Sequence, residues 1–494
     1  MRFTVGEIAE ATGGQILAGV PEAPAGRIAT DTRALERGET FLALRGERHD
    51  GHAFLAEAVG RGAVCLVIDR PDVLPAGEGG PAVVRVADTL EALGALGRAA
   101  RARLACPVIA ITGSCGKTTL KEMIGQVLGR RLKGRLPPKS FNNLIGVPLT
   151  LLAAEEDDAF VVCEFGTNAP GEIASLARLA RPTIGVVTLV GEAHLEGLGS
   201  LEGVAEEKGA LVESLPPDGL AVLNADDERV LAMRRRTRAR VVTFGLGAEA
   251  DLRAQDVIQT VEGIQFTLVE SRRASAGCCA GTAEEGVGFV LPVWGEHHVG
   301  LALAASAVAR ELGVAWEETA EALQRFRPPP MRLAVEEAGG VVLVNHAYNA
   351  NPESMRAALG TLRLWPERRK VFFCGDMREL GSASAAAHAA LGRAAAEAGV
   401  KRLVCVGPEA REAARSAVAA GIPEKAVSTC ATAAEAAAGA AGIVRPGDVV
   451  LVKGSRAVRM EQVAEAVSAW MRQAAGPQDR ARRTRRAVKR GEAR

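Results

Sequence analysis

A strand followed directly by a glycine-rich loop and a helix limits the possible folds of this 494-residue chain more than any other feature. The apolar run Val108–Thr112 predicts a buried strand, Gly113-Ser114-Cys115-Gly116-Lys117-Thr118-Thr119 follows it, and a helical stretch continues to about Arg131. Such a loop binds phosphate, because its backbone N–H groups turn inward and the helix N-terminus adds positive potential. In this arrangement Lys117 reaches the β- and γ-phosphates of a nucleotide, and the Thr118 hydroxyl contacts Mg²⁺. Ile111 stands where the strict pattern has its first glycine, but the variant remains specific, since Lys and Thr have no packing reason to be there.

Apolar strands and helical stretches alternate after residue 105, which predicts a mostly parallel sheet with helices on both faces. Arg327-Pro328-Pro329-Pro330 is the clearest linker, and a second α/β series follows it. We therefore predict an α/β protein with a small N-terminal α/β domain, a central parallel-sheet domain that carries the phosphate loop, and a Rossmann-like C-terminal domain. The predicted bounds are 1–104, 105–326 and 327–475, with a basic disordered tail over 476–494.

Two strand ends near the loop carry side chains suited to a metal site. Glu164 ends the predicted strand 159–165, and His194 follows the strand 183–190. The carboxyl ends of parallel strands face the ligand crevice, and a carboxylate there suits Mg²⁺, which takes oxygen ligands. Because His194 would lie beside Glu164 and the loop, we interpret it as a metal or phosphate contact. Lys208, within Glu206-Glu207-Lys208-Gly209, is by local sequence alone a solvated charge on a helix.

Charge and cysteine usage exclude several classes of protein. The formal net charge is +1, so no global field indicates nucleic acid, although residues 477–494 carry eight Lys/Arg and two Asp/Glu. No apolar run is long enough to span a membrane, and the N-terminus lacks a signal peptide. None of the nine cysteines has C-x-x-C spacing, and several lie in strand-like runs, which is typical of free thiols in a reducing cytoplasm. Cys115 could be a low-pKa thiol, but the simpler interpretation is a variable loop position.

The motifs, taken in order, resemble those of the Mur ligases of peptidoglycan synthesis over about residues 2–472. The shared runs are the phosphate loop, Glu164-Phe165-Gly166-Thr167-Asn168, Gly171-Glu172-Ile173, His194-Leu195 and Lys208-Gly209. Other runs resemble the family member that adds D-alanyl-D-alanine to UDP-N-acetylmuramoyl-tripeptide: Thr30-Asp31-Thr32-Arg33, Arg45-Gly46, Asp50-Gly51-His52, Phe141-Asn142-Asn143, Tyr348-Asn349-Ala350-Asn351-Pro352, Gly375-Asp376-Met377 with Glu379-Leu380-Gly381, and Lys453-Gly454-Ser455-Arg456.

This resemblance implies an ATP-dependent ligase that forms an acyl phosphate with Mg²⁺. It implies Thr118, Glu164, His194 and Lys208 as metal-site positions, with Lys208 carbamylated so that a cation becomes an anionic ligand. Arg332 looks like the arginine that closes onto the phosphates, and His346 takes the position that meets the ATP ribose. It further implies a cytoplasmic monomer whose partners are small molecules. The positions implied to bind substrate are Asp31, Thr32, Arg33, Arg45, Asp50, His52, Asn142, Asn143, Thr167, Asn168, Tyr348, Asn349 and Asn351.

Three positions depart from the family at the nucleoside. The family segment G-x-H-N-x-x-N reads Gly295-Glu296-His297-His298-Val299-Gly300-Leu301, so both asparagines are replaced. His346 stands where the family has an acidic residue, and a histidine binds a hydroxyl less favourably than a carboxylate does. We expect phosphate chemistry to be kept while adenosine recognition is rearranged.

Three alternatives remain open at the level of sequence. A sister ligase would add a different amine, a folate polyglutamate ligase would lack the UDP-binding run, and a non-catalytic relative would only bind the UDP-peptide. The replacements at His298, Leu301 and His346 favour the last of these, whereas Lys117 and Glu164 argue against it.

Overall fold

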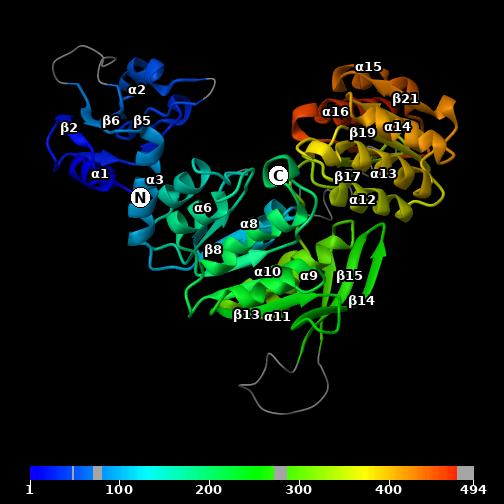
Figure 1. The fold of residues 1–494 in the computed structure, drawn as a ribbon, viewed down its shortest axis with the longest axis horizontal. Coiled ribbons are helices and arrows are strands. Elements are labelled where there is room, and N and C mark those ends of the chain that lie inside the picture. The colour runs from blue at the N-terminus through cyan, green and yellow to red at the C-terminus, as the bar shows by residue number, and fades with distance from the viewer. Residues whose placement is uncertain (47–48, 71–79, 139, 272–285, 476–494) are drawn as a thin grey trace.

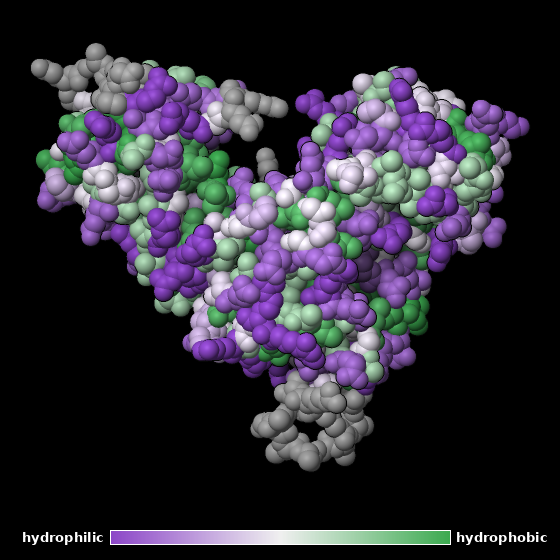
Figure 2. Space-filling view, viewed as in Figure 1, coloured by the Kyte–Doolittle hydropathy of each residue, from purple (hydrophilic) through white to green (hydrophobic). Residues whose placement is uncertain are grey.

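The chain folds into three α/β units, each built on its own sheet. The computed structural model describes residues 1–46, 49–70, 80–138, 140–271 and 286–475. The N-terminal and C-terminal units lie on opposite sides of the central unit (Figure 1), and in the space-filling view they rise from it as two lobes (Figure 2). The predicted α/β class with three domains is therefore confirmed. The predicted tail lies outside the described residues.

The N-terminal unit holds a five-stranded sheet in the order β2-β7-β6-β5-β4 and a two-stranded ribbon, β1-β3. Its last helix, α3, shares a hydrophobic cluster with the central helices α5 and α6, so this helix fastens the unit to the central sheet. The strands are β1 (Phe3–Thr4), β2 (Gln15–Ala18), β3 (Pro24–Gly26), β4 (Ile28–Ala29), β5 (Thr40–Leu42), β6 (Cys65–Ile68) and β7 (Ala82–Arg85). The helices are α1 (Val5–Thr12), α2 (Leu55–Gly60) and α3 (Thr89–Arg103).

The central sheet has nine strands in the order β16-β15-β14-β13-β12-β11-β8-β10-β9. Its strands from β9 to β14 are parallel, as predicted, and β14, β15 and β16 form an antiparallel edge. The strands are β8 (Val108–Thr112), β9 (Gly134–Arg135), β10 (Phe160–Glu164), β11 (Ile184–Val187), β12 (Leu220–Asn224), β13 (Arg240–Gly245), β14 (Leu252–Thr260), β15 (Gly263–Glu270) and β16 (Val287–Leu291). The helices are α4 (Lys117–Leu128), α5 (Gly146–Ala153), α6 (Glu172–Ala180), α7 (Leu195–Leu198), α8 (Leu201–Glu213), α9 (Glu228–Ala232), α10 (His297–Glu311) and α11 (Trp316–Leu323).

Strand β8 marks the point where the strand order of the central sheet reverses. The chain places β9 and β10 on one side of β8 and β11, β12 and β13 on the other. The crevice outside the carboxyl ends of the strands at such a switch point is where open α/β sheets bind ligands. The phosphate loop, Glu164 at the end of β10 and His194 after β11 therefore meet at one edge of the sheet.

The C-terminal sheet has six strands in the order β17-β18-β22-β19-β20-β21, all parallel except β17. Alternate strand residues pack under different helix layers, which explains the continuous apolar runs in inner strands, such as Val341–Val344 and Val449–Val452. The strands are β17 (Ala334–Ala338), β18 (Val341–His346), β19 (Arg369–Gly375), β20 (Arg402–Val406), β21 (Val427–Cys430) and β22 (Asp448–Lys453). The helices are α12 (Pro352–Thr361), α13 (Ser384–Glu397), α14 (Ala410–Ala419), α15 (Ala433–Ile443) and α16 (Glu461–Ala474).

Membrane and thiol features agree with the sequence over the described ranges. There, no helix combines the length and apolarity needed to cross a bilayer. The seven cysteines of the described part are free thiols. The remaining two, Cys278 and Cys279, lie outside it.

Candidate active site

The phosphate loop has the conformation that its sequence predicts. Gly116 is left-handed at φ 87°, and α4 begins at Lys117. Gly113 leaves no room for a side chain, since a Cβ there would lie 1.8 Å from Thr188 Oγ1. The Lys117 Nζ donates to Gly113 O at 2.6 Å, so the lysine curls over its own loop. Burial is the main cause that lowers the pKa of Lys117.

Thr118 is the centre of a hydrogen-bond chain that crosses two domains. Its Oγ1 lies 2.9 and 3.1 Å from the carboxylate oxygens of Glu164, which is 2% exposed. Arg332, from the segment before β17, donates from Nη2 to Thr118 Oγ1 at 2.9 Å. The predicted metal oxygens and the predicted phosphate-closing arginine are thus in direct contact.

A cavity of about 820 Å³ lies between the central and C-terminal units and contains most of the predicted site. Of the predicted residues, it is lined by Ser114, Cys115, Gly116, Lys117, Thr118, Thr119, Asn142, Asn143, Glu164, Thr167, Asn168, His194, Arg332, His346, Tyr348, Asn349 and Asn351. Gly113 and Lys208 lie behind this surface.

The C-terminal unit touches the phosphate loop directly. Asn351 Nδ2 lies 3.1 Å from Cys115 Sγ, so Cys115 serves as a packing and hydrogen-bonding contact in this arrangement. The Tyr348 hydroxyl donates to Ser140 Oγ at 2.8 Å, and the Arg332 guanidinium lies 4.0 Å from the centre of the Tyr348 ring. The two units are therefore closed over the loop.

Lys208 is buried, which makes the interpretation of a solvated helix charge wrong. Its exposed fraction is 1%, and burial, followed by the nearby charge of Lys117, lowers its pKa to about 7. The neighbouring Glu207 is also buried and accepts the backbone N–H groups of Gly171 and Ile173. This side of α8 therefore faces α6 and the loop before it. Such burial cannot be inferred from the four residues Glu206-Glu207-Lys208-Gly209 alone.

His194 lies at the same cavity and is held by Glu379, which belongs to the family-like run Glu379-Leu380-Gly381 but was not predicted to be a site residue. Its Nδ1 is 2.6 Å from Glu379 Oε2, in the loop after β19. This contact crosses from the central to the C-terminal unit. The site residues that sequence reasoning missed also include Ser140, Glu353 and Lys453.

Lys453 ends β22 beside His346 and is fully buried. Its Nζ donates to Asn349 O at 2.8 Å, and burial lowers its pKa to about 7. Lys453 belongs to the family-like run Lys453-Gly454-Ser455-Arg456, and its place at the end of an apolar strand is the signal that could have predicted a site role.

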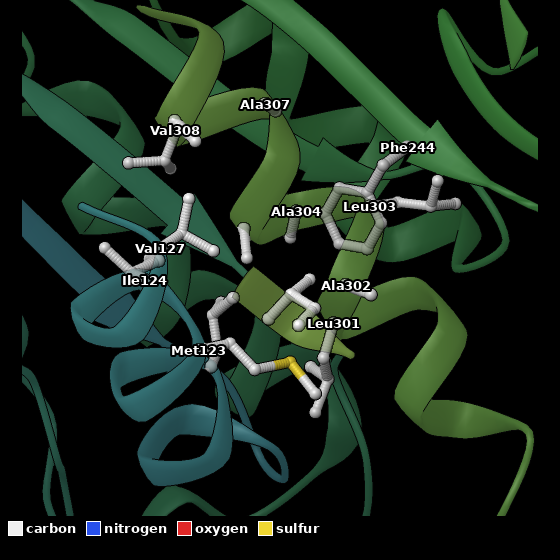
Figure 3. Packing of buried hydrophobic residues seen from close by; sticks show 14 of the residues in the cluster. Met123, Ile124, Val127, Phe244, Leu301, Ala302, Leu303, Ala304, Ala307 and Val308 are labelled. Carbon is white, nitrogen blue, oxygen red and sulfur yellow. The ribbon is translucent and has the colours of Figure 1, made fainter. Parts of the chain in front are cut away.

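The end of the cavity with the three departing positions, His298, Leu301 and His346, lies beside the hydrophobic core. Leu301 lies beside Met123 where α10 crosses α4 (Figure 3), in a hydrophobic cluster that also contains Phe244. A Cβ on Gly116 would lie 2.8 Å from the Leu301 Cδ2. His298 Nδ1 lies 2.8 Å from Trp294 O, which fixes the proton on Nδ1 because a carbonyl only accepts. Burial lowers the pKa of His298 to about 4, so its ring is neutral at pH 7.

His346 completes this end of the cavity. Its Nδ1 is buried without a hydrogen-bond partner among the described residues. Burial and the charge of Lys453 lower its pKa well below the ordinary value. His346 itself lines the cavity.

The six N-terminal positions do not line this cavity, and they form two polar groups. His52 is held between Asp50, at 2.7 Å from Nδ1, and Asp69, at 3.3 Å from Nε2. Arg45 pairs with Asp69 at 3.0 Å. In the second group, Arg33 pairs with Asp31, and the hydrogen bond from Arg33 lowers the pKa of Asp31 to about 2. Thr32 is buried beside them. The structure therefore places the implied UDP-binding residues in two groups, and neither lines the cavity at the phosphate loop.

The residues at the loop suit a magnesium ion. Mg²⁺ is typically held by one or two carboxylates together with substrate phosphates and water, and less often by an all-protein cage. Glu164 and Thr118 present such oxygens at the phosphate loop. Consistently, the described residues contain no group of three or more His, Cys, Asp and Glu side chains able to enclose a metal.

A phosphate loop at the switch point of one sheet, closed by a second α/β unit, defines a nucleotide-dependent enzyme of the Mur ligase type. Three family models match the chain: the Mur ligase family catalytic domain over 26–101, the Mur ligase middle domain over 111–309 and the Mur ligase glutamate ligase domain over 331–456. The chain belongs to the Mur ligase family.

Within that family the chain is similar to one member in particular. It is 38% identical, over 95% of its length and 98% of the relative, to the UDP-N-acetylmuramoyl-tripeptide–D-alanyl-D-alanine ligase of Mycobacterium bovis. The crystal structure of MurF from Acinetobacter baumannii superposes with a TM-score of 0.83 at 31% identity, covering 96% of this chain and 99% of that one. The MurF ligase of Thermotoga maritima in complex with ADP gives a TM-score of 0.77 at 26% identity, covering 91% and 99%.

Proposed function

We propose that the chain joins D-alanyl-D-alanine to UDP-N-acetylmuramoyl-tripeptide and cleaves ATP to ADP and phosphate as it does so. The observation that carries this proposal is the closed contact among Thr118, Glu164 and Arg332 over the phosphate loop. The relatives similar over nearly the whole chain bear the name of this activity, and one related structure contains ADP.

The chemistry requires activation of a carboxylate, which is a poor electrophile toward an amine. An oxygen of the tripeptide carboxylate attacks the γ-phosphorus, the bond to ADP breaks, and an acyl phosphate forms. The dipeptide amine then attacks the acyl carbon, phosphate leaves, and the amine loses a proton. Lys117, Arg332 and the loop N–H groups stabilise the charge that spreads over the γ-phosphoryl group in flight.

Closure of the two units protects the acyl phosphate from water. The contacts of Tyr348 with Ser140 and of Asn351 with Cys115 hold the C-terminal unit over the loop. Exclusion of water also strengthens the electrostatic interactions inside the cavity.

We assign Thr118, Glu164 and His194 to hold Mg²⁺, which would neutralise phosphate charge when bound. Lys208 would join them as a carbamate. Its pKa of about 7 leaves the amine largely neutral at slightly alkaline pH, and a neutral amine is the form that attacks CO₂ and then releases a proton. An ordinary lysine, with a pKa near 10.4, would be almost fully protonated there.

The other sequence predictions complete the proposal. The N-terminal group of Asp31, Thr32, Arg33, Arg45, Asp50 and His52 would bind the UDP moiety. Asn142, Asn143, Thr167, Asn168, Tyr348, Asn349 and Asn351 would contact the peptide and the amine, and His346 the ribose. The domain bounds 1–104, 105–326 and 327–475, a cytoplasmic site of action and a monomeric state remain predictions.

Product formation tests the proposal directly. Purified protein is given ATP, Mg²⁺, UDP-tripeptide and D-alanyl-D-alanine, separately and together, and ADP and UDP-pentapeptide are measured by mass spectrometry. We expect equal amounts of both products only when all components are present, and none with Lys117→Ala. Binding of UDP-tripeptide without any turnover at saturating ATP would instead identify a non-catalytic relative.

A further inference from the structure

Two residues from different units meet at the edge of the cavity. His194 Nδ1 lies 2.6 Å from Glu379 Oε2, and the backbone N–H of Glu196 donates to Glu379 O at 3.1 Å. His194 and Glu379 are both left-handed, with φ values of 57° and 65°, although neither is glycine. A left-handed conformation is unfavourable for such residues, so this two-point contact holds both in conformations that local sequence disfavours.

The contact determines which histidine nitrogen can bind a metal. An ionised carboxylate can only accept, so Nδ1 carries the proton and Nε2 keeps its lone pair. In metal sites, a histidine ligand commonly donates its second ring N–H to a carboxylate, which fixes the ring orientation and raises the basicity of the ligating nitrogen.

The loop that carries Glu379 is fixed to the C-terminal unit. The backbone N–H of Met377 donates to His388 Nε2 at 3.0 Å, and that of Arg378 donates to Ser455 Oγ at 2.8 Å. His388 is fully buried. Glu379 therefore moves with the C-terminal unit, whereas His194 moves with the central unit.

We propose that Glu379 is a positioning residue that sets the tautomer and orientation of His194, so that the metal site is complete only when the two units close. This inference deepens the proposed function, because it assumes His194 as the Mg²⁺ ligand named there. Thermodynamic linkage then requires the converse: if closure improves metal binding, the metal favours closure by the same factor.

The test compares Glu379→Ala and Glu379→Gln with Glu196→Gln. Glu196 is an exposed residue at the same interface, and its backbone contact survives the substitution. Mn²⁺ affinity is measured by calorimetry with a non-hydrolysable ATP analogue bound, and closure by X-ray scattering with and without metal. The tautomer of His194 is followed by ¹⁵N NMR of histidine-labelled protein, with His194→Gln used to assign its signals.

Glu379→Ala is expected to weaken Mn²⁺ binding by about 10- to 100-fold. It should also abolish metal-induced compaction and the Nδ1–H tautomer signature. Nucleotide affinity in EDTA should stay unchanged. Glu379→Gln, whose amide oxygen still accepts, should recover part of the effect, and Glu196→Gln should match the wild type.

Two results would overturn the inference. If Glu379→Ala loses compaction but binds Mn²⁺ like the wild type, Glu379 is only a latch between units. If neither metal affinity nor tautomer changes, the contact does not position His194. A wild type that binds metal and nucleotide but makes no product would defeat the proposed function while still allowing this comparison.

Discussion

Replacement of Lys208 by methionine should make the protein more stable while it abolishes ligation. Methionine has a similar length and shape but no amine, so it removes the cost of burying one. Lys208 is 1% exposed and its pKa is lowered to about 7, mainly by burial. In the unfolded chain the same group has a pKa of roughly 10.4.

The sign and size of the effect follow from proton linkage. Between pH 7 and 10.4 the unfolded state binds more protons at this position than the folded state does, so wild-type stability rises with pH across that window. A shift of about 3.5 units, at about 1.4 kcal/mol each, gives an upper value of about 5 kcal/mol at and below pH 7. We expect Lys208→Met to be about 3–5 kcal/mol more stable at pH 7, with the difference shrinking toward pH 10.

Urea denaturation followed by tryptophan fluorescence at pH 7, 8.5 and 10, in CO₂-free buffer, measures this difference. Lys121→Met is the matched control. Lys121 is also fully buried, but it donates to Pro137 O at 3.0 Å and pairs with Glu122, so its removal leaves an acceptor unpaired. The control should be destabilised at every pH. A Lys208→Met variant that is no more stable at pH 7, or whose gain persists at pH 10, would refute the reasoning.

Three further substitutions test the cavity. Leu301→Asn supplies a hydrogen-bonding group at the proposed nucleoside end of the cavity and should lower the KM for ATP roughly two- to tenfold. This factor corresponds to one net hydrogen bond of about 0.5–1.5 kcal/mol. An unchanged KM would show that this position does not meet the base. Arg332→Ala removes the donor to Thr118 Oγ1 and should lower kcat by at least about 100-fold with little change in UDP-tripeptide binding; a loss confined to KM would contradict its role at the phosphates. Gly116→Ala, at φ 87° with a Cβ 2.8 Å from Leu301, should lower the melting temperature and raise the KM for ATP, whereas Gly421→Ala, at φ 101° in open space, should change only the melting temperature.

The parallel sheets could be predicted because their signal is local. Strands covered on both faces are continuously apolar, as β8 and β22 are, and such runs stand out between amphipathic helices. The phosphate loop could be predicted for the same reason, since strand, glycines, lysine and helix are adjacent in sequence.

Features that depend on packing between distant elements could not be predicted from local sequence. The burial of Glu207 and Lys208 depends on the elements that pack against α8, and nothing within Glu206-Glu207-Lys208-Gly209 distinguishes a covered face from an open one. Glu379 is far from His194 in the chain, and its left-handed backbone has no signature in a non-glycine residue. Lys453 becomes a site residue only because β22 is inserted between β18 and β19.

The central claim is that ATP activates the substrate carboxylate as an acyl phosphate within this cavity. Oxygen transfer tests it most directly. The terminal carboxylate of UDP-tripeptide is labelled with ¹⁸O, the complete reaction is run, and the released phosphate is analysed by mass spectrometry. The account predicts one ¹⁸O in each phosphate, in proportion to the UDP-pentapeptide formed. Product formation with unlabelled phosphate would contradict an acyl phosphate and the roles assigned to Lys117 and Arg332.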